Sequence, residues 1–261
     1  MTAINAICLE SEAFIATDSL FYSYAGEPLG MGAKVWTLPH LGSAIAFRGD
    51  RALSIRLYAA IMLRGDIVGG FDELVAVLPE IVESVLDGAK AELAANGLSE
   101  KAGIFLAYDL FVSGWSASAA RMVLLCGTRR NGQSGKLQRF DFLSAPAIPG
   151  TDYEEAWGKD CDTKPVDLGQ IVRYLERQRQ YAHKVLSASQ AGVISGDVVL
   201  VHVTRDAIQC GRIAQFTDYE LRVAQLRKIA ATGAVPTARG LTNDNAPSVS
   251  AFVAAKPANA G

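Results

Sequence analysis

The order of the expected secondary-structure elements constrains the fold of this chain more than any other feature. Short apolar runs rich in β-branched and aromatic residues come first, and helical periodicity begins only after residue 48. Two helices, a second group of strands, a long helix, a last hairpin and a final helix follow. Because β-α-β alternation is absent, two antiparallel sheets are expected rather than a parallel one. We predict an α+β fold, a four-layer αββα sandwich with helices covering both sheets.

Turn residues bound the expected strands, and apolar stripes at helical spacing define the expected helices. Glu10-Ser11-Glu12 joins the first two strands into a hairpin, whereas Gly114-Trp115-Ser116 indicates a tight turn. Pro79 lies inside the second helix and predicts a kink or a new start there. The strands are expected at 4–9, 13–16, 34–38, 43–47, 103–107, 111–112, 121–126, 137–142, 198–203 and 208–216. The helices are expected at about 48–65, 72–93 and 166–187, and from 217 onward.

The composition changes near residue 232. From there to residue 261 the chain consists mostly of Ala, Pro, Asn, Ser and Thr, with too few large apolar side chains to pack independently. We expect one domain over 1–231 and a flexible tail or docking segment over 232–261.

Charge and cysteine usage exclude several classes of protein. The 25 basic and 27 acidic residues nearly cancel, so no electrostatic footprint for nucleic acid is present. The four cysteines (Cys8, Cys126, Cys161 and Cys210) form no CxxC pair, which argues against a zinc site or a disulfide scaffold, and three of them lie in strand patterns typical of a core. Neither a leader-like N-terminus nor an apolar run of about 18 residues is present. We expect a soluble, cytoplasmic protein without metal, cofactor or membrane contact.

Three polar residues lie where strands begin or end. Asp18 ends the second expected strand, Lys34 begins the third, and Thr2 becomes the first residue if Met1 is removed. A small residue after the initiator methionine favours that removal. If the first strand pairs with its neighbours, a hydroxyl, a carboxylate and an ammonium meet at one mouth of the sandwich.

These residues give the chain a resemblance to the proteasome β-subunit superfamily of N-terminal nucleophile hydrolases, as a bacterial or phage proteasome-like homologue. The matching segments are Thr2-Ala3-Ile4, Ala16-Thr17-Asp18-Ser19, Lys34-Val35 and Ile45-Ala46-Phe47-Arg48-Gly49-Asp50. The family spaces its threonine, aspartate and lysine by sixteen residues, as Thr2, Asp18 and Lys34 are here. The resemblance spans residues 2 to about 216. It implies a threonine-type endopeptidase, a homo-oligomeric ring, a peptide or protein substrate, and an unfoldase or a phage or bacterial assembly partner.

The chemistry of such a site follows from the residue types. A threonine hydroxyl is a weak nucleophile, and a free α-amino group with a pKa of about 7.7 to 8.0 is a suitable base. The Lys34 cation would lower the proton affinity of both groups, while Asp18 would orient Lys34. Backbone N–H groups of the turn that begins at Ala46 and Phe47 would stabilise the acyl oxyanion.

The chain also departs from the family pattern. The family's Gly-Ser-Gly-Ser and Asp-x-x-Ser-Gly segments are replaced by Phe142–Pro146 and Ser189–Asp197, in which Ser144, Ser189 and Ser195 are possible accessory residues. Ala46 occupies the oxyanion position that is usually glycine. Two other functions therefore remain open, a catalytically inactive structural or assembly protein and a small-molecule amidase. Thr2 could equally be an ordinary second residue behind a retained Met1.

Overall fold

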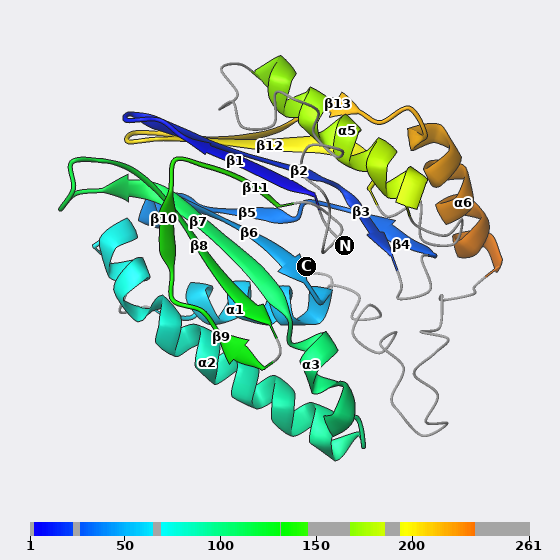
Figure 1. Ribbon diagram of the computed structural model, residues 1–261, viewed down its shortest axis with the longest axis horizontal. Coiled ribbons are helices and arrows are strands. Elements are labelled where there is room, and N and C mark those ends of the chain that lie inside the picture. The colour runs from blue at the N-terminus through cyan, green and yellow to red at the C-terminus, as the bar shows by residue number, and fades with distance from the viewer. Residues whose placement is uncertain are drawn as a thin grey trace, which may run out of the picture.

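The computed structural model describes residues 3–22, 27–64, 69–130, 132–145, 168–185 and 194–232. Two antiparallel sheets lie face to face between two layers of helices (Figure 1). The fold is therefore α+β with the predicted αββα order of layers. The tail beyond residue 232 lies outside the described residues.

The first sheet contains the strand with which the described chain begins. β1 is paired on one side with β11 and on the other with β2, and β12 and β13 continue the sheet. Because it is central and covered on both faces, β1 is buried along its whole length. The strands in spatial order are β11 (Phe142–Ala145), β1 (Ile4–Cys8), β2 (Glu12–Asp18), β12 (Asp197–Thr204) and β13 (Ile208–Gln215).

The second sheet brings the third and fourth expected strands together with the middle of the chain. It runs in the order β10 (Gln138–Phe140), β8 (Arg121–Arg130), β7 (Tyr108–Ser116), β6 (Ser43–Gly49) and β5 (Val35–Leu38). The short β9 (Gln133–Ser134) pairs with β8. A separate two-stranded ribbon, β3 (Leu20–Tyr22) and β4 (Pro28–Met31), was not signalled by the sequence pattern.

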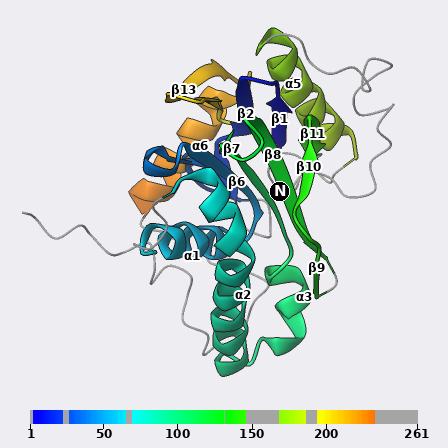
Figure 2. The same ribbon diagram turned by 90° about the vertical axis from the view of Figure 1, so that its left-hand side faces the viewer.

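Helices cover the outer face of each sheet, and the two views agree on their placement (Figures 1 and 2). α1 (Arg51–Met62) and α2 (Phe71–Ala95) pack below the second sheet, and α5 (Leu168–Val185) lies over β1 and β2. α6 (Tyr219–Thr232) follows β13. The smaller helices are η1 (Pro39–Leu41), η2 (Ser99–Lys101) and α3 (Ala102–Phe105).

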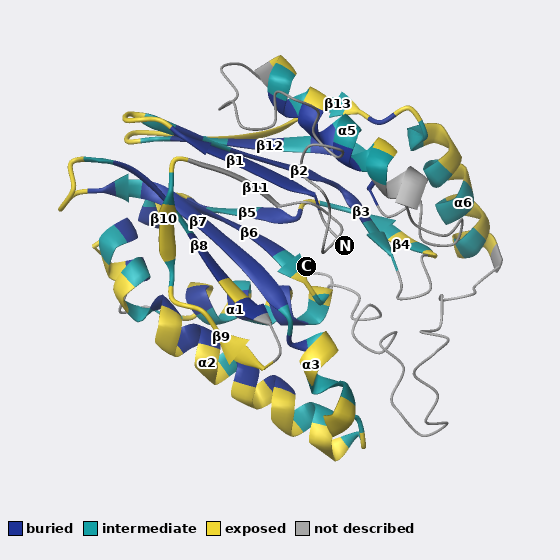
Figure 3. Ribbon diagram, viewed as in Figure 1, coloured by how far each residue is buried: buried dark blue, intermediate teal, exposed yellow. Residues whose placement is uncertain are grey.

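Three apolar clusters correspond to the three interfaces of the sandwich. One lies between the second sheet and the helices α1 and α2, one between the two sheets, and one beneath α5. Figure 3 shows the resulting pattern, with buried strands in the middle and exposed residues on the outer faces of the helices. Among the described residues, no helix is long and apolar enough to cross a membrane.

Several local predictions are corrected by the structure. Residues 102–105 form the helix α3 rather than a strand, because so short an apolar run does not distinguish the two. Gly114 lies within β7 and not in a turn. A Cβ there would come within 2.4 Å of the Phe71 side chain, so this glycine allows close packing between the strand and α2. Of the two outcomes predicted at Pro79, a new start does not occur, because α2 runs from Phe71 to Ala95, held by its buried face against the sheet. Cys8 and Cys126 are buried, but Cys210 is exposed on β13.

Candidate functional site

A buried ion pair joins the two sheets at the end of β2. The Lys34 Nζ lies 2.7 Å from the Asp18 Oδ2, and the two side chains are 3% and 0% exposed. Asp18 is the last residue of β2, and Lys34 directly precedes β5. The structure thus brings together two of the three residues that the sixteen-residue spacing selects.

The same carboxylate holds the start of the described chain. The Ala3 N–H donates a hydrogen bond of 3.0 Å to the Asp18 Oδ1, while Oδ2 accepts from Lys34. Ala3 is completely buried, and the next residue begins β1. Thr2, the third predicted residue, lies outside the described residues. Asp18 therefore connects Lys34 to the backbone nitrogen that follows Thr2 in the sequence.

Burial opposes the charges of both members of the pair. Desolvation raises the pKa of Asp18 above its usual 3.8, against the attraction of Lys34 and the hydrogen bonds from Lys34 and Ala3. Desolvation likewise lowers the pKa of Lys34 below its usual 10.5, against the attraction of Asp18. Desolvation thus shifts the pKa of each group in the direction of its neutral form, while the ion pair and the Ala3 hydrogen bond oppose that shift. Perturbed, paired groups of this kind are typical of functional sites.

Aromatic rings from β3 surround the ammonium. The Lys34 Nζ lies 5.5 Å from the centre of the Phe21 ring and 5.9 Å from that of Tyr22. The guanidinium carbon of Arg51, at the start of α1, lies 4.5 Å from the centre of the Phe21 ring. These contacts favour positive charge next to the aromatic faces. Within the described part of the chain, the buried hydroxyls of Thr17 and Tyr22 have no hydrogen-bond partner.

A tight turn at residues 195–197 packs against the end of β2. The Ser195 carbonyl accepts hydrogen bonds from the N–H groups of Ser19 and Leu20, at 3.3 and 3.1 Å. The Asp197 N–H donates to the Ser19 Oγ at 2.7 Å. Gly196 between them has φ +88, and a Cβ there would lie 2.4 Å from the Ser19 Oγ. Only glycine fits this turn, which therefore fixes the backbone directly after Asp18.

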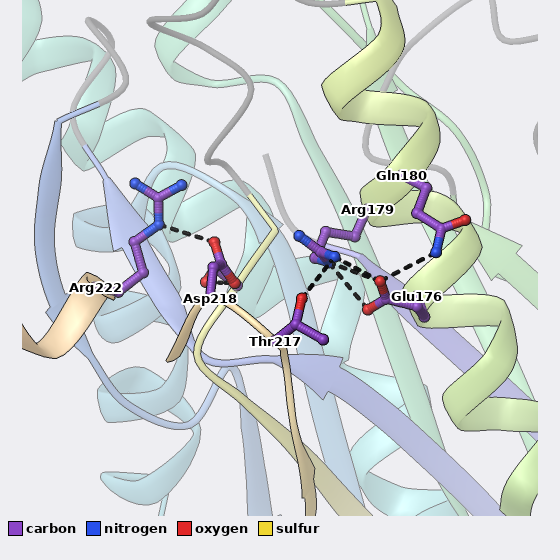
Figure 4. A network of polar contacts seen from close by, with 7 residues as sticks. Glu176, Arg179, Gln180, Thr217, Asp218 and Arg222 are labelled. Atoms are coloured by element: carbon purple, nitrogen blue, oxygen red, sulfur yellow. Dashed lines mark hydrogen bonds and ion pairs between the residues drawn. The ribbon is translucent and has the colours of Figure 1, made fainter. Parts of the chain in front are cut away.

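A polar network continues from this turn to the helical layer (Figure 4). The Ser195 Oγ donates to the Asp218 Oδ1 at 2.7 Å, and the Arg222 Nε donates to the Asp218 Oδ2 at 3.1 Å. On the neighbouring α5, Arg179 pairs with Glu176 and also donates to the Thr217 hydroxyl at 2.9 Å. The sequence gave no signal of a role for Asp218, because its contact with Ser195 spans 23 residues.

No side-chain contacts are described for the other two predicted accessory serines, Ser144 and Ser189. Ser144 lies in β11 opposite Asn5 of β1, and its side chain is not described. Ser189 lies outside the described residues. Of the three serines, Ser195 alone has described side-chain and backbone contacts that lead to the end of β2.

The predicted oxyanion residues, Ala46 and Phe47, lie inside β6, next to the start of β5, which Lys34 directly precedes. Ala46 is opposite Val35 of β5 and Phe111 of β7. The Phe47 N–H donates to the Lys34 carbonyl at 3.3 Å, a long hydrogen bond. Since successive N–H groups of a strand point to opposite neighbours, the Ala46 N–H faces β7. Both groups belong to the sheet ladder, and an oxyanion would have to compete with it.

The described residues contain no group of three or more His, Cys, Asp or Glu side chains that could hold a metal ion. The candidate site therefore consists of the Asp18–Lys34 pair, the anchored start of β1 and the turn at Ser195–Asp197.

Comparison with solved structures defines the class of fold. No family model and no curated protein matches the sequence. Solved structures of similar architecture include Anbu proteins.

Three of these structures share the fold at low sequence identity. An Anbu mutant from Hyphomicrobium sp. strain MC1 is 14% identical with a TM-score of 0.56, over 89% of this chain and 96% of that one. Anbu from Yersinia bercovieri, described as an ancestral beta-subunit, is 12% identical with a TM-score of 0.55, over 99% and 100%. Anbu from Pseudomonas aeruginosa, described as a helical assembly, is 16% identical with a TM-score of 0.56, over 88% and 93%. At this identity the likeness establishes the fold.

Proposed function

We propose that this protein is a proteasome-like threonine-type peptidase subunit that uses Thr2 as its nucleophile after Met1 is removed. The main support is the double contact of Asp18, which binds the Lys34 ammonium at 2.7 Å and the Ala3 N–H at 3.0 Å. Thr2 is covalently bonded to that Ala3 nitrogen, so it is separated from the ion pair by one peptide bond. A buried cation beside an N-terminal hydroxyl is the arrangement that this chemistry requires.

The proposed reaction begins with attack of the Thr2 Oγ on the scissile carbonyl. The free α-amino group of Thr2 takes the hydroxyl proton and returns it to the departing amine, which leaves an ester on Thr2. Water then attacks the ester, loses its proton to the same amine and regenerates the hydroxyl. Lys34 keeps positive charge near the hydroxyl, and Asp18 orients Lys34 throughout the cycle.

The proposed oxyanion donor is the Phe47 N–H, because the Ala46 N–H faces β7 on the other side of β6 and cannot donate to the same oxyanion. The Phe47 N–H now bonds the Lys34 carbonyl at 3.3 Å, beyond the usual distance for a strong hydrogen bond. A charged oxyanion is a better acceptor than a carbonyl and can displace this long contact. We also propose Ser195, with Ser144 and Ser189, as accessory residues.

We further propose that the subunit assembles with copies of itself into a ring and acts on peptides or proteins in the cytoplasm. The similarity to a structure described as a helical assembly of the Anbu complex supports self-association of some kind. An unfoldase or a phage or bacterial assembly component is the expected partner. Light scattering during gel filtration tests this directly, and a monomer at micromolar concentration would contradict it.

The proposal is tested at the first residue. Intact-mass analysis is expected to show loss of Met1, and a threonine-directed covalent inhibitor is expected to add one molecule per processed chain. Thr2→Ala should abolish both inhibitor labelling and peptide hydrolysis, while the matched variant Thr2→Ser should retain them because it keeps a hydroxyl. Retention of Met1 on every chain, or full activity of Thr2→Ala, would refute the proposal.

The second candidate function is a structural or assembly subunit that has lost catalysis. The sheet-bonded Phe47 N–H and the absence of the family's serine-rich segments favour it. It predicts a defined oligomer that no threonine-directed inhibitor labels, and loss of assembly when residues 233–261 are deleted. A small-molecule amidase, the third possibility, would instead hydrolyse small amides and leave peptides intact.

A further inference from the structure

Asp218 directly precedes α6 and connects this helix to the turn at residues 195–197, which packs against the end of β2. Both of its carboxylate oxygens are used, because Oδ1 accepts from the Ser195 Oγ at 2.7 Å and Oδ2 from the Arg222 Nε at 3.1 Å. Arg222 and Asp218 are only 12% and 14% exposed. This partly buried charge is therefore held by the Ser195 hydroxyl and by the Arg222 guanidinium, and Figure 4 shows the contact with Arg222.

Ser195 transmits this contact to the backbone beside the ion pair. Ser195 is completely buried, and its carbonyl accepts hydrogen bonds from the N–H groups of Ser19 and Leu20. The Gly196 carbonyl accepts the Phe216 N–H at 3.0 Å, which closes the turn onto the end of β13. Rotation of the Ser195 backbone would therefore break hydrogen bonds to the two residues that follow Asp18.

We propose that Asp218 is a positioning residue that acts through Ser195 to hold the turn at 195–197 against Ser19 and so fixes Asp18 beside Lys34. The positioning role stands on these contacts, and only its effect on hydrolysis rests on the proposed function. The carboxylate of Asp218 directly precedes α6. No spacing in the sequence relates it to the Asp18–Lys34 pair.

The test compares Asp218→Ala with Glu176→Ala. Glu176 is the matched control, because it belongs to the same polar network but its described contacts lead to Arg179 and Gln180 rather than to Ser195. Amide hydrogen exchange of Ser19 and Leu20 is followed in both variants, with Phe111 in the central strand β7 as the internal reference. Asp218→Ala is expected to speed exchange at Ser19 and Leu20 by about tenfold, the effect of losing one hydrogen bond of ordinary strength, and Glu176→Ala is not.

Two further measurements separate positioning from general loosening. Ser195→Ala should reproduce the exchange pattern, and the double variant should add nothing to it, since both changes interrupt one chain of contacts. Titration of the Lys34 ammonium by NMR should show a lower pKa in Asp218→Ala than in the parent, because Asp18 attracts it less. Equal effects of Asp218→Ala and Glu176→Ala, or unchanged Ser19 and Leu20 exchange, would overturn the proposal.

The kinetics of peptide hydrolysis provide an independent test. If the parent protein cleaves peptides, Asp218→Ala should lower kcat by about tenfold or more with little change in KM, as expected for a misplaced catalytic group. A selective rise in KM would contradict a positioning role. If the parent cleaves nothing, the proposed function fails, whereas the exchange and titration measurements still decide the role of Asp218.

Discussion

Asp18 and Lys34, sixteen residues apart in the sequence, form a 2.7 Å ion pair from which water is almost completely excluded. Burial is the largest influence on both groups, since desolvation raises the pKa of Asp18 and lowers that of Lys34, against their mutual attraction. A buried pair of this kind is weak support for stability.

The first prediction concerns the stability of this pair. Asp18→Asn or Lys34→Met alone should lower the free energy of unfolding by about 3 to 5 kcal/mol, because each leaves one buried charge without its partner. The double variant Asp18→Leu/Lys34→Met should recover most of this loss, since no charge remains to be desolvated. Urea unfolding followed by tryptophan fluorescence measures all three variants. A double variant that loses the sum of both single effects would contradict this interpretation.

The architecture was predictable because its signals are local. The change from strand patterns to helical periodicity near Arg48 reflects side-chain directions that differ between strands and helices, and the structure follows it closely. The errors occurred where local patterns are ambiguous or tertiary packing decides. The apolar run around Ile104 folds as a helix, and Gly114 continues a strand beneath Phe71.

The site was only partly predictable from the sequence. Asp18 and Lys34 stand at the ends of expected strands, and the sixteen-residue spacing of the family that the chain resembles selected them. The contact between Ser195 and Asp218 depends on how the β12–β13 hairpin brings its two ends together. No periodicity records such a contact, because it is a product of tertiary geometry.

The second prediction concerns acid sensitivity at Asp72, near the start of α2. Burial opposes its charge, but hydrogen bonds from Ser116, Ala117 and Ser118 outweigh this and lower the pKa of Asp72 below its usual 3.8. A lowered folded-state pKa stabilises the protein above the unfolded pKa, and this contribution is lost as the pH falls through the folded value. The difference in stability between the parent and Asp72→Asn should therefore shrink on acidification below about pH 4. Urea midpoints at pH 7 and pH 3 measure it, and a constant difference would contradict the assignment.

The third prediction tests the packing between β7 and α2. A Cβ at Gly114 would lie 2.4 Å from the Phe71 ring and 2.7 Å from the Ser43 Oγ. Gly114→Ala should therefore lower the free energy of unfolding by about 1 to 3 kcal/mol, the usual cost of overpacking. Gly211→Ala in β13 is the matched control, because nothing lies within 4 Å of its Cβ position. Thermal unfolding should show a lower Tm for the first variant alone.

The fourth prediction concerns the pH dependence of peptide hydrolysis and follows from the proposed base. If the α-amino group of Thr2 accepts the hydroxyl proton, the rate should rise as that amine loses its proton, with a midpoint at or below about 7.7 to 8.0. The nearby Lys34 cation accounts for a value at the lower side, because like charge disfavours protonation of the amine. Steady-state rates between pH 5.5 and pH 9 measure the midpoint, which Thr2→Ser should preserve because its base is the same amine. Chemical acetylation of the amino terminus should abolish the activity, and an acetylated protein that still cleaves peptides would exclude the amine as the base.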